Sequence, residues 1–266
     1  QIDGWTPTNR EQETGDREQL GALDRWILSR LNRLVVDVSN NLDGYDTAGA
    51  IALYKKFVNE LSTWYIRRSR DRVGPSSEDG TDRQNFYETA YEVLRTLSKV
   101  IAPITPFIAE SMYRNLTDME SVHLEFWPSE NKDLINTDLE KEMEFGQELA
   151  STVSAFRKDA GVKVKIPFRK LFYSGHKLTD GVLEIVKEET NVEELEFKND
   201  SEKYAVEGET DLSNQNIEAG KARDIIRSIQ QKRKEIGTTM VQMVNVFLPS
   251  WPKEFEEEIK RKALVS

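Results

Sequence analysis

The chain has 266 residues, no cysteine and a formal net charge of −10, which argues against a generally basic nucleic-acid-binding protein. Without cysteine, disulfides and thiolate metal sites are excluded, and His123 and His176 alone are a weak basis for a metal site. No apolar run reaches the roughly eighteen residues of a membrane span, and the polar first thirty residues hold no apolar stretch of signal-peptide type, so we expect neither a span nor a leader. We therefore expect a soluble, cytoplasmic protein without a membrane partner, long enough for two domains.

The first part of the chain predicts a bundle of helices. Residues 1–19 are polar and aperiodic, as expected of a linker from a preceding domain. Residues 23–38 place apolar side chains at the three-four spacing of an amphipathic helix, and Asp43-Gly44 ends it. A second helix carries the apolar stripe of residues 54–65 and ends before Gly74.

Further helices follow in the same pattern. After a Ser/Gly/Pro/Asp loop at residues 74–82, a third helix carries an apolar stripe over residues 86–101 and stops at Pro103. Thr105 is the expected N-cap of a fourth helix, with Pro106 at its first position. These helices predict an antiparallel arrangement, because short connections join each to the next.

An extended strap and a long helix complete the first domain. Residues 121–128 alternate and are bounded by turn residues, so they predict the strap. Residues 137–159 predict a fifth helix, which Gly161 is placed to end. The expected helical-bundle domain therefore covers residues 20–165.

Residues 166–266 predict a separate, smaller α+β domain, so the whole chain is expected to be mainly α. Short apolar runs at residues 171–173 and 192–197 predict strands on either side of a helix at residues 181–189, a β-α-β unit. Three further elements are expected: a basic helix at residues 219–236, a final strand at residues 245–248 and an acidic helix from Pro252.

Three stretches concentrate positive charge in this acidic chain, and we call them the basic islands. Residues 62–72 hold four arginines against one aspartate, residues 157–170 six basic residues against one aspartate, and residues 221–235 six against two acidic residues. Such an arrangement places a polyanion in one orientation and discourages binding elsewhere. Each island taken alone is equally well explained as a solvated helix face or loop.

No catalytic constellation is present in the sequence. There is no glycine-rich phosphate loop, no paired-histidine helix motif and no nucleophile elbow. Close carboxylate pairs are expected by chance among 47 acidic residues. We therefore assign no active site, no metal site and no cofactor to this chain.

The first island, STWYIRRSRDR at residues 62–72, combines aromatic and guanidinium groups. Arginine gives phosphate paired hydrogen bonds, and tryptophan stacks unpaired bases, so the mixture fits RNA. At 100° per residue, Arg68 and Arg72 return to the apolar stripe, while Arg67 and Arg70 point to the opposite side. We expect Arg68 and Arg72 in structural ion pairs and Arg67 and Arg70 on phosphates. Trp64 is more readily explained as core than as a stacking platform.

Several segments resemble the anticodon-binding region of the class I isoleucyl, valyl and leucyl synthetases. They occur in that family's order from about Leu23 to the chain end: LDRWILSRLN, STWYIRRSRDR, IAPITPF, SVHLEFWP, FRKDAGVKVKIPF and ARDIIRSIQQKRKE. The doubled arginine after Trp-Tyr resembles the isoleucyl branch. Two departures, Val73-Gly74 for an aromatic pair and Lys165-Ile166 for Arg-Gln, bear on individual nucleotide contacts.

The resemblance implies that the chain docks the anticodon stem-loop of tRNA, that for isoleucine, for a catalytic domain that precedes it. That domain would hold the family's ATP motifs, of HIGH and KMSKS type, which are absent here. The candidate tRNA contacts are residues of the three islands: Trp64, Arg67, Arg68, Arg70, Arg72, Arg157, Lys158, Lys163, Lys165, Arg227, Lys232 and Arg233.

Two other readings stay open at this point. In the first reading, the chain is the same domain of a valyl or leucyl enzyme. In the second reading, it is a structural or protein-interaction module of a synthetase complex. In the second reading the basic islands meet acidic proteins. Salt-dependent binding to tRNA, but not to a generic acidic protein, separates it from tRNA docking.

Overall fold

The computed structural model describes residues 5–6, 20–74, 80–208, 214–239 and 241–265. The chain divides into two compact units, Gln1–Lys141 and Glu142–Ser266. This division falls within the long helix α6 (Thr137–Asp159), earlier than the domain boundary that the sequence predicted after residue 165.

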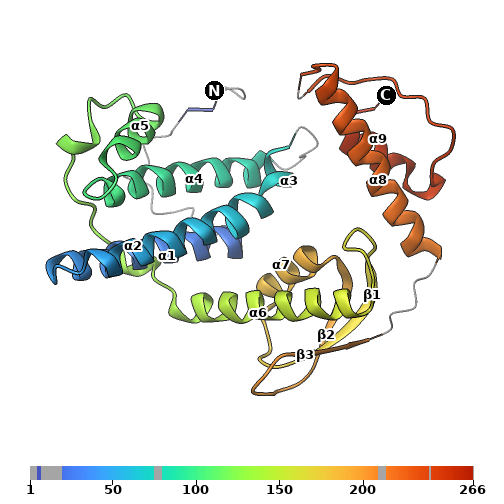
Figure 1. The fold of residues 1–266 in the computed structure, drawn as a ribbon, viewed down its shortest axis with the longest axis horizontal. Coiled ribbons are helices and arrows are strands. Elements are labelled where there is room, and N and C mark those ends of the chain that lie inside the picture. Colours follow the sequence, from blue (N-terminus) through green and yellow to red (C-terminus); the bar gives the residue numbers. More distant parts are fainter. Residues whose placement is uncertain (1–4, 7–19, 75–79, 209–213, 240, 266) are drawn as a thin grey trace. The chain divides into compact units, whose positions relative to one another are not determined.

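The first unit is the predicted antiparallel bundle (Figure 1). Its helices are α1 (Ala22–Asp43), α2 (Thr47–Glu60), α3 (Arg70–Val73), α4 (Gly80–Ile101) and α5 (Pro106–Leu116). α1 packs against α2 and α4, and α4 packs against α5. Trp26, Ile27 and Phe57 are almost completely buried, as the helical periodicity predicted.

Two connections differ locally from the prediction. Thr105 stands at the N-cap of α5 and Pro106 in its first turn, as expected, but the Thr105 hydroxyl donates to the carbonyl of Ile101, at 3.2 Å, and makes no capping hydrogen bond. The strap contains a 3₁₀ turn, Val122–Leu124, before it becomes extended. The alternation of apolar residues in the strap therefore reflects an irregular segment with one turn.

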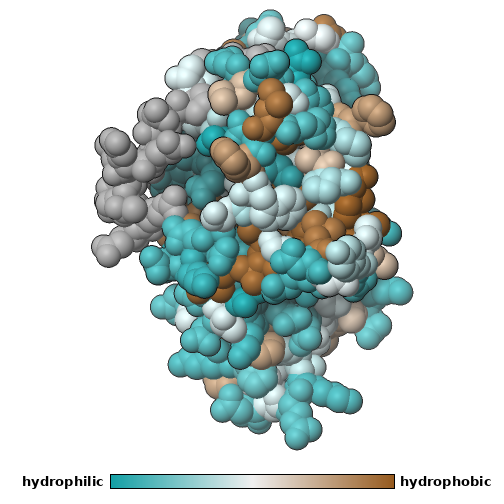
Figure 2. Space-filling model, turned by 90° about the vertical axis from the view of Figure 1, so that its left-hand side faces the viewer, coloured by the Kyte–Doolittle hydropathy of each residue, from teal (hydrophilic) through white to brown (hydrophobic). Residues whose placement is uncertain are grey.

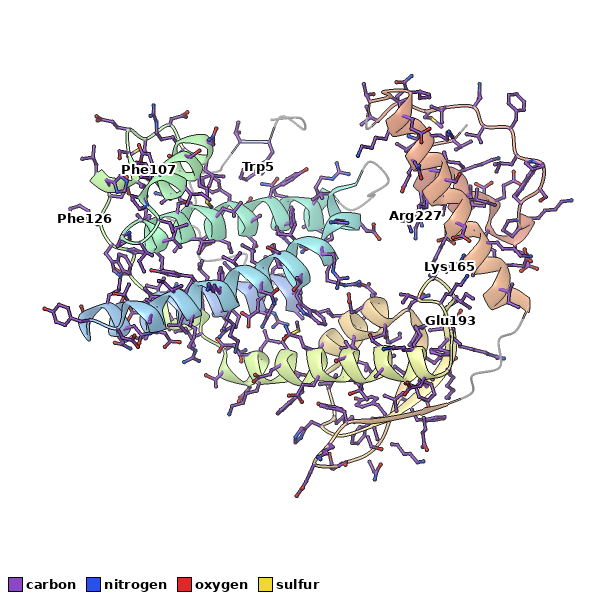
Figure 3. The ribbon with its side chains drawn as sticks, viewed as in Figure 1. Trp5, Phe107, Phe126, Lys165, Glu193 and Arg227 are labelled. Carbon is purple, nitrogen blue, oxygen red and sulfur yellow. The ribbon has the colours of Figure 1, made fainter. Side chains whose placement is uncertain are left out.

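Most of the predicted linker, residues 1–19, lies outside the described residues. Trp5 is described, and its ring lies against Tyr87 and Tyr91 of α4, with centroid distances of 5.7 and 5.8 Å (Figure 3). Aromatic pairs at such distances add to the free energy gained by burial alone. The N-terminal segment thus has at least one aromatic contact with the bundle.

The second unit contains the predicted β-α-β arrangement on the C-terminal part of α6. Strands β1 (Phe168–Ser174) and β2 (Val192–Asn199) pair in parallel, and α7 (Asp180–Thr190) connects them. A third strand, β3 (Ala205–Gly208), pairs antiparallel with β1, which gives the order β2-β1-β3. Sequence analysis did not predict β3, because it is short and mostly exposed.

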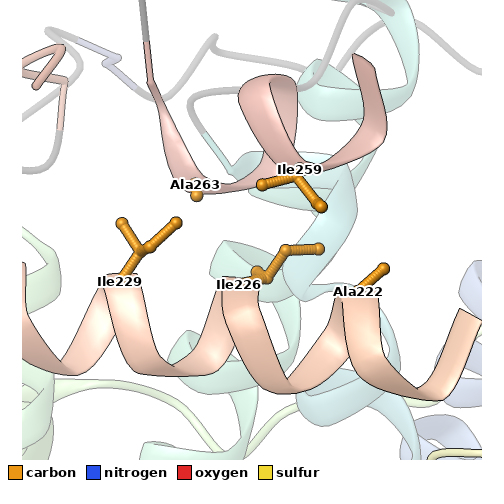
Figure 4. Packing of buried hydrophobic residues seen from close by; sticks show 5 residues of the cluster. All are labelled: Ala222, Ile226, Ile229, Ile259 and Ala263. Carbon is orange, nitrogen blue, oxygen red and sulfur yellow. The ribbon is translucent and has the colours of Figure 1, made fainter. Parts of the chain in front are cut away.

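Two helices form a second core within this unit. α8 (Asn214–Glu235) and α9 (Glu256–Ala263) bury an apolar cluster between them (Figure 4), which consists of Ala222, Ile226, Ile229, Ile259 and Ala263. The strand predicted at residues 245–248 is wrong, since these residues form no strand; the neighbouring Val244 forms an isolated bridge with Val265. Among the described residues, no helix has the length and apolar character needed to cross a membrane, and no cluster of metal-ligating side chains occurs.

Candidate nucleic-acid interface

The first basic island is anchored in the bundle by a buried carboxylate. α2 continues directly into a π-helical segment, Leu61–Ile66, which changes the direction in which the following side chains point. Asp24 of α1 is 1% exposed and accepts hydrogen bonds from the Tyr65 hydroxyl at 2.8 Å and from both terminal nitrogens of Arg72 at 2.8 and 2.7 Å. The predicted structural ion pair of Arg72 is therefore confirmed.

The rest of the Arg72 side chain is also fully engaged. Its Nε donates to the carboxylate of Asp82 at 2.9 Å, and its guanidinium lies 5.7 Å from the ring centroid of Phe86. Burial acts to lower the pKa of Arg72, but the hydrogen bonds to Asp24 and Asp82 outweigh burial, and the pKa is raised. Burial, reinforced by the Asp24 charge, also raises the pKa of Tyr65. Arg72 therefore fixes the end of this helical run and does not point to solvent.

The other candidates in the island differ in their exposure. Arg67 and Arg70 are exposed, as the helical wheel predicted, and the Arg67 Nε donates to the carbonyl of Thr63 at 2.8 Å. Arg68 and Trp64 are half-buried. The island thus presents two guanidinium groups to solvent from a backbone that Arg72 holds.

The second island begins where α6 ends. Gly161 adopts a left-handed conformation with φ of 67°, and the amide of Val162 donates to the carbonyl of Arg157 at 3.0 Å. The amide of Gly161 donates to the carbonyl of Lys158 at 3.1 Å, which completes a Schellman ending. The prediction that Gly161 ends the helix is confirmed.

Arg157, a candidate tRNA contact, is turned inward. Its side chain is 3% exposed, and its guanidinium lies 4.2 Å from the ring centroid of Phe168. Burial, and then the positive charge of Arg223, lower the pKa of Arg157 to about 10, so it is still protonated at neutral pH. The guanidinium has no access to a phosphate in this arrangement, because protein atoms surround it.

The loop that follows α6, residues 160–167, is held by side chains that donate to its carbonyls. Arg157 donates to the carbonyls of Lys163 and Ile166 at 3.2 and 2.6 Å. The Asn191 amide donates to the carbonyl of Val164 at 2.8 Å, and Arg223 of α8 to that of Lys165 at 2.7 Å. Four consecutive carbonyls therefore receive side-chain donors.

The lysines of the second island differ from Arg157 in their exposure. Lys158 and Lys163 are exposed, and Lys165 is half-buried and forms an ion pair with Asp224 of α8. The loop and the N-terminal half of α8 therefore meet, and Lys165 and Arg227 come from these two elements (Figure 3). Arg227 is exposed.

The third island also contains an inward-facing arginine. Arg233, a candidate tRNA contact, is 8% exposed and donates to the carbonyls of Thr239 and Leu264 at 3.1 and 3.4 Å, so it is turned away from solvent. Lys232 is exposed and pairs with Glu235 at 2.7 Å. Of the three residues predicted on α8, Arg227 and Lys232 remain at the surface.

Sequence reasoning missed two residues of this interface, Asn191 and Arg223. Asn191 ends α7 in a left-handed conformation with φ of 54°, which asparagine tolerates better than most residues. Its position between a predicted helix and a predicted strand was the available signal. Arg223 gave no signal beyond its place in a basic helix.

A known protein family matches the part of the chain that contains the bundle and the first two basic islands. The model of the family described as the anticodon-binding domain of tRNA ligase matches residues 24–172. This range contains the bundle, the first two basic islands and most of strand β1.

Many curated proteins are similar to this chain. The isoleucine–tRNA ligase of Dehalococcoides mccartyi strain 195 is 34% identical over 99% of the chain and 28% of its own length. Those of Clostridium novyi and Chlamydia muridarum are 38% and 39% identical over 68% and 77% of the chain, and over 18% and 20% of their own lengths. The chain thus spans less than a third of each of these relatives.

Proposed function

Because the chain belongs to the family of anticodon-binding domains of tRNA ligases, we propose that it docks the anticodon stem-loop of a tRNA. The observation that carries this proposal is the exposure of Arg67 and Arg70 directly beside the buried Arg72–Asp24 pair. A rigid helix end with two outward guanidinium groups suits phosphate binding, because little conformational freedom is lost on contact.

The second unit supplies further contacts in this proposal. Lys158, Lys163 and Arg227 are exposed, and the loop that carries Lys163 and Lys165 contacts α8, the helix that carries Arg227. In protein–DNA complexes, half or more of the hydrogen bonds go to phosphate and sugar. We propose the same division here, in which these groups set the position of the RNA and splayed bases are read elsewhere. Half-buried Trp64 is the proposed stacking surface for one such base.

We further propose that the tRNA is that for isoleucine and that the chain is part of a cytoplasmic isoleucine–tRNA ligase. The relatives with this name cover 68–99% of the chain in the three cases above. In this proposal the remainder of the ligase performs ATP-dependent aminoacylation, and this chain brings the tRNA into position. The doubled Arg67-Arg68 after Trp-Tyr supports the same branch.

Binding measurements test the proposal directly. Fluorescence anisotropy of labelled anticodon stem-loop RNA should show saturable binding that is tighter for the isoleucine anticodon than for a stem-loop of the same length with a valine anticodon. Equal binding of both RNAs, and of an unrelated hairpin, would contradict anticodon recognition. A valine preference would favour the valyl branch.

Contact with another protein surface is the second candidate function. The exposed side chains of Phe107 and Phe126 are 91% and 93% accessible, and Ile108 and Leu124 beside them in sequence are 57% and 69% accessible. Figure 2 shows apolar surface among polar groups on the side of the bundle that carries α5. Such surface favours a protein partner, and we propose that this partner is the catalytic part of the ligase.

Two substitutions separate the two functions. Phe107→Ser and Phe126→Ser remove apolar surface without touching a basic island, so stem-loop affinity should stay within about twofold of the parent. A large loss of RNA affinity in these variants would mean that the α5 surface belongs to the RNA site.

A further inference from the structure

Arg157 and Arg233 occupy equivalent positions at the ends of two helices. Each stands four residues before the glycine that ends its helix, Gly161 or Gly237, and both glycines have positive φ, 67° and 73°. In each case the arginine's own carbonyl accepts the amide hydrogen bond that closes the helix end. The chain then turns back across the arginine side chain, which donates to carbonyls beyond the turn.

The Arg157 guanidinium connects two segments that are far apart in sequence. One terminal nitrogen donates to the carbonyls of Lys163 and Ile166 in the loop, and the other to those of Thr190 and Asn191, at 2.9 and 3.1 Å. Among the described residues, no carboxylate contacts this guanidinium. Its hydrogen bonds all go to backbone carbonyl oxygens. Its role in the structure is therefore to order backbone.

The consequence for the loop is a fixed orientation of its peptide groups. The carbonyls of residues 163 to 166 all receive donors from Arg157, Asn191 or Arg223. With the negative ends of four peptide dipoles directed to these donors, the Lys163 side chain stays exposed beside them. An anion that approaches Lys163 and Lys165 is therefore repelled less by carbonyl oxygens than it would be if the loop were unrestrained.

We propose that Arg157 is a positioning residue, which holds the loop of residues 160–167 in the one conformation that presents Lys163 and Lys165 to the RNA backbone. This inference rests on the proposed docking function, and it adds a residue that does not itself contact RNA. Arginine suits this role because its planar fork reaches carbonyls on two sides. Lysine concentrates its donors on one nitrogen and does not span both segments.

Arg157→Lys is the decisive substitution, because it keeps the charge and removes the fork. Full-length parent and variant are titrated with unmodified anticodon stem-loop RNA over a series of salt concentrations, at a temperature where circular dichroism shows both folded. We expect binding to weaken by roughly tenfold for each lysine contact that is lost. The slope of log K against log salt should fall by about 1.4–1.8 units for two lost contacts, although the net charge is unchanged.

A double-mutant cycle separates positioning from general destabilisation. Lys163→Ala/Lys165→Ala should weaken RNA binding in the parent but add little in the Arg157→Lys background, because the lysines are already misplaced. Amide hydrogen exchange of residues 162–166 in the RNA-free variant should be at least about tenfold faster than in the parent. Arg233→Lys is the matched control at the end of α8. Its effect on RNA affinity should add to that of Lys163→Ala/Lys165→Ala.

Each contrary outcome has a separate meaning. If Arg157→Lys binds RNA like the parent, or if its effect adds fully to that of the lysine pair, Arg157 does not position the loop. If the lysine pair itself has no effect in the parent, the loop does not contact RNA, and the docking proposal for this loop fails together with the inference.

Discussion

The guanidinium of Arg72 forms two hydrogen bonds, of 2.8 and 2.7 Å, to the two carboxylate oxygens of Asp24, which lies 48 positions earlier in the chain. The Asp24 side chain is 1% exposed, and that of Arg72 is 15% exposed. This pair joins the start of α1 to α3, which begins at Arg70 and follows directly on the segment that carries Arg67. The proposed RNA-binding arginines are therefore supported by a buried ion pair.

Arg72→Ala should strongly destabilise the bundle. It leaves the Asp24 carboxylate buried with only the Tyr65 hydroxyl as a donor among the hydrogen bonds described, and breaking such a pair typically costs about 3–5 kcal/mol. Urea unfolding followed by circular dichroism measures the change. Arg70→Ala is the matched control on the same short helix, and we expect it to lie within about 0.5 kcal/mol of the parent because Arg70 is exposed. Equal stability of the two variants would contradict the anchoring role of Arg72.

The strap should loosen in acid. Glu110 accepts from the amide of Val122 and the hydroxyl of Ser121, each at 2.9 Å, and these hydrogen bonds, the amide first, lower its pKa. The hydrogen bond from Lys99 likewise lowers the pKa of Glu125. A carboxyl group whose pKa is lower in the folded state stabilises it above the unfolded pKa of about 4.5, and this stabilisation is lost as pH falls through the folded value.

Tryptophan fluorescence reports this change. The Trp127 indole donates to the hydroxyl of Ser39 at 2.8 Å, so release of the strap should alter its emission between about pH 5 and pH 3. The difference between the parent and a Trp127→Phe variant isolates this signal. Glu110→Gln should weaken the acid-dependent change, whereas an unchanged transition in that variant would show that Glu110 does not hold the strap.

Gly161→Ala should destabilise the second unit. The added Cβ meets no atom within 4 Å, but the φ of 67° is unfavourable for alanine. The cost is about 1–2 kcal/mol, which thermal unfolding measures as a lower Tm. Gly80→Ala, at the start of α4 and also without close neighbours, is the control and should keep or raise the Tm. A Gly161→Ala variant as stable as the parent would contradict the Schellman ending.

Helical periodicity predicted most of the bundle because its helices bury one continuous stripe. The apolar spacing from Trp26 to Val38 correctly predicted α1. The glycine at position 161 correctly predicted where α6 ends. It did not predict the π-helical segment before Arg67, since the extra residue in that turn leaves no pattern in the sequence. Arg72 was placed correctly in spite of this, and the ion pair predicted for Arg68 stays a prediction.

The site was less predictable, because charge alone does not tell whether a side chain points outward. Arg157 and Arg233 were predicted as tRNA contacts, yet both are buried against carbonyls beyond their helix ends. Their direction depends on the turn that follows each helix, and therefore on tertiary structure. The shared spacing of four residues to a glycine is a sequence signal for such an arginine.

The central claim is that the exposed basic residues of the islands bind the backbone of the anticodon stem-loop, and the salt dependence of that binding tests it most directly. The chain and its Arg67→Ala/Arg70→Ala variant are titrated with stem-loop RNA between about 50 and 200 mM salt. We expect log K to fall linearly with log salt for the parent, and the slope of the variant to be shallower by roughly 0.7–0.9 unit per lost contact, with unchanged unfolding. Identical affinities and slopes for parent and variant would contradict the account.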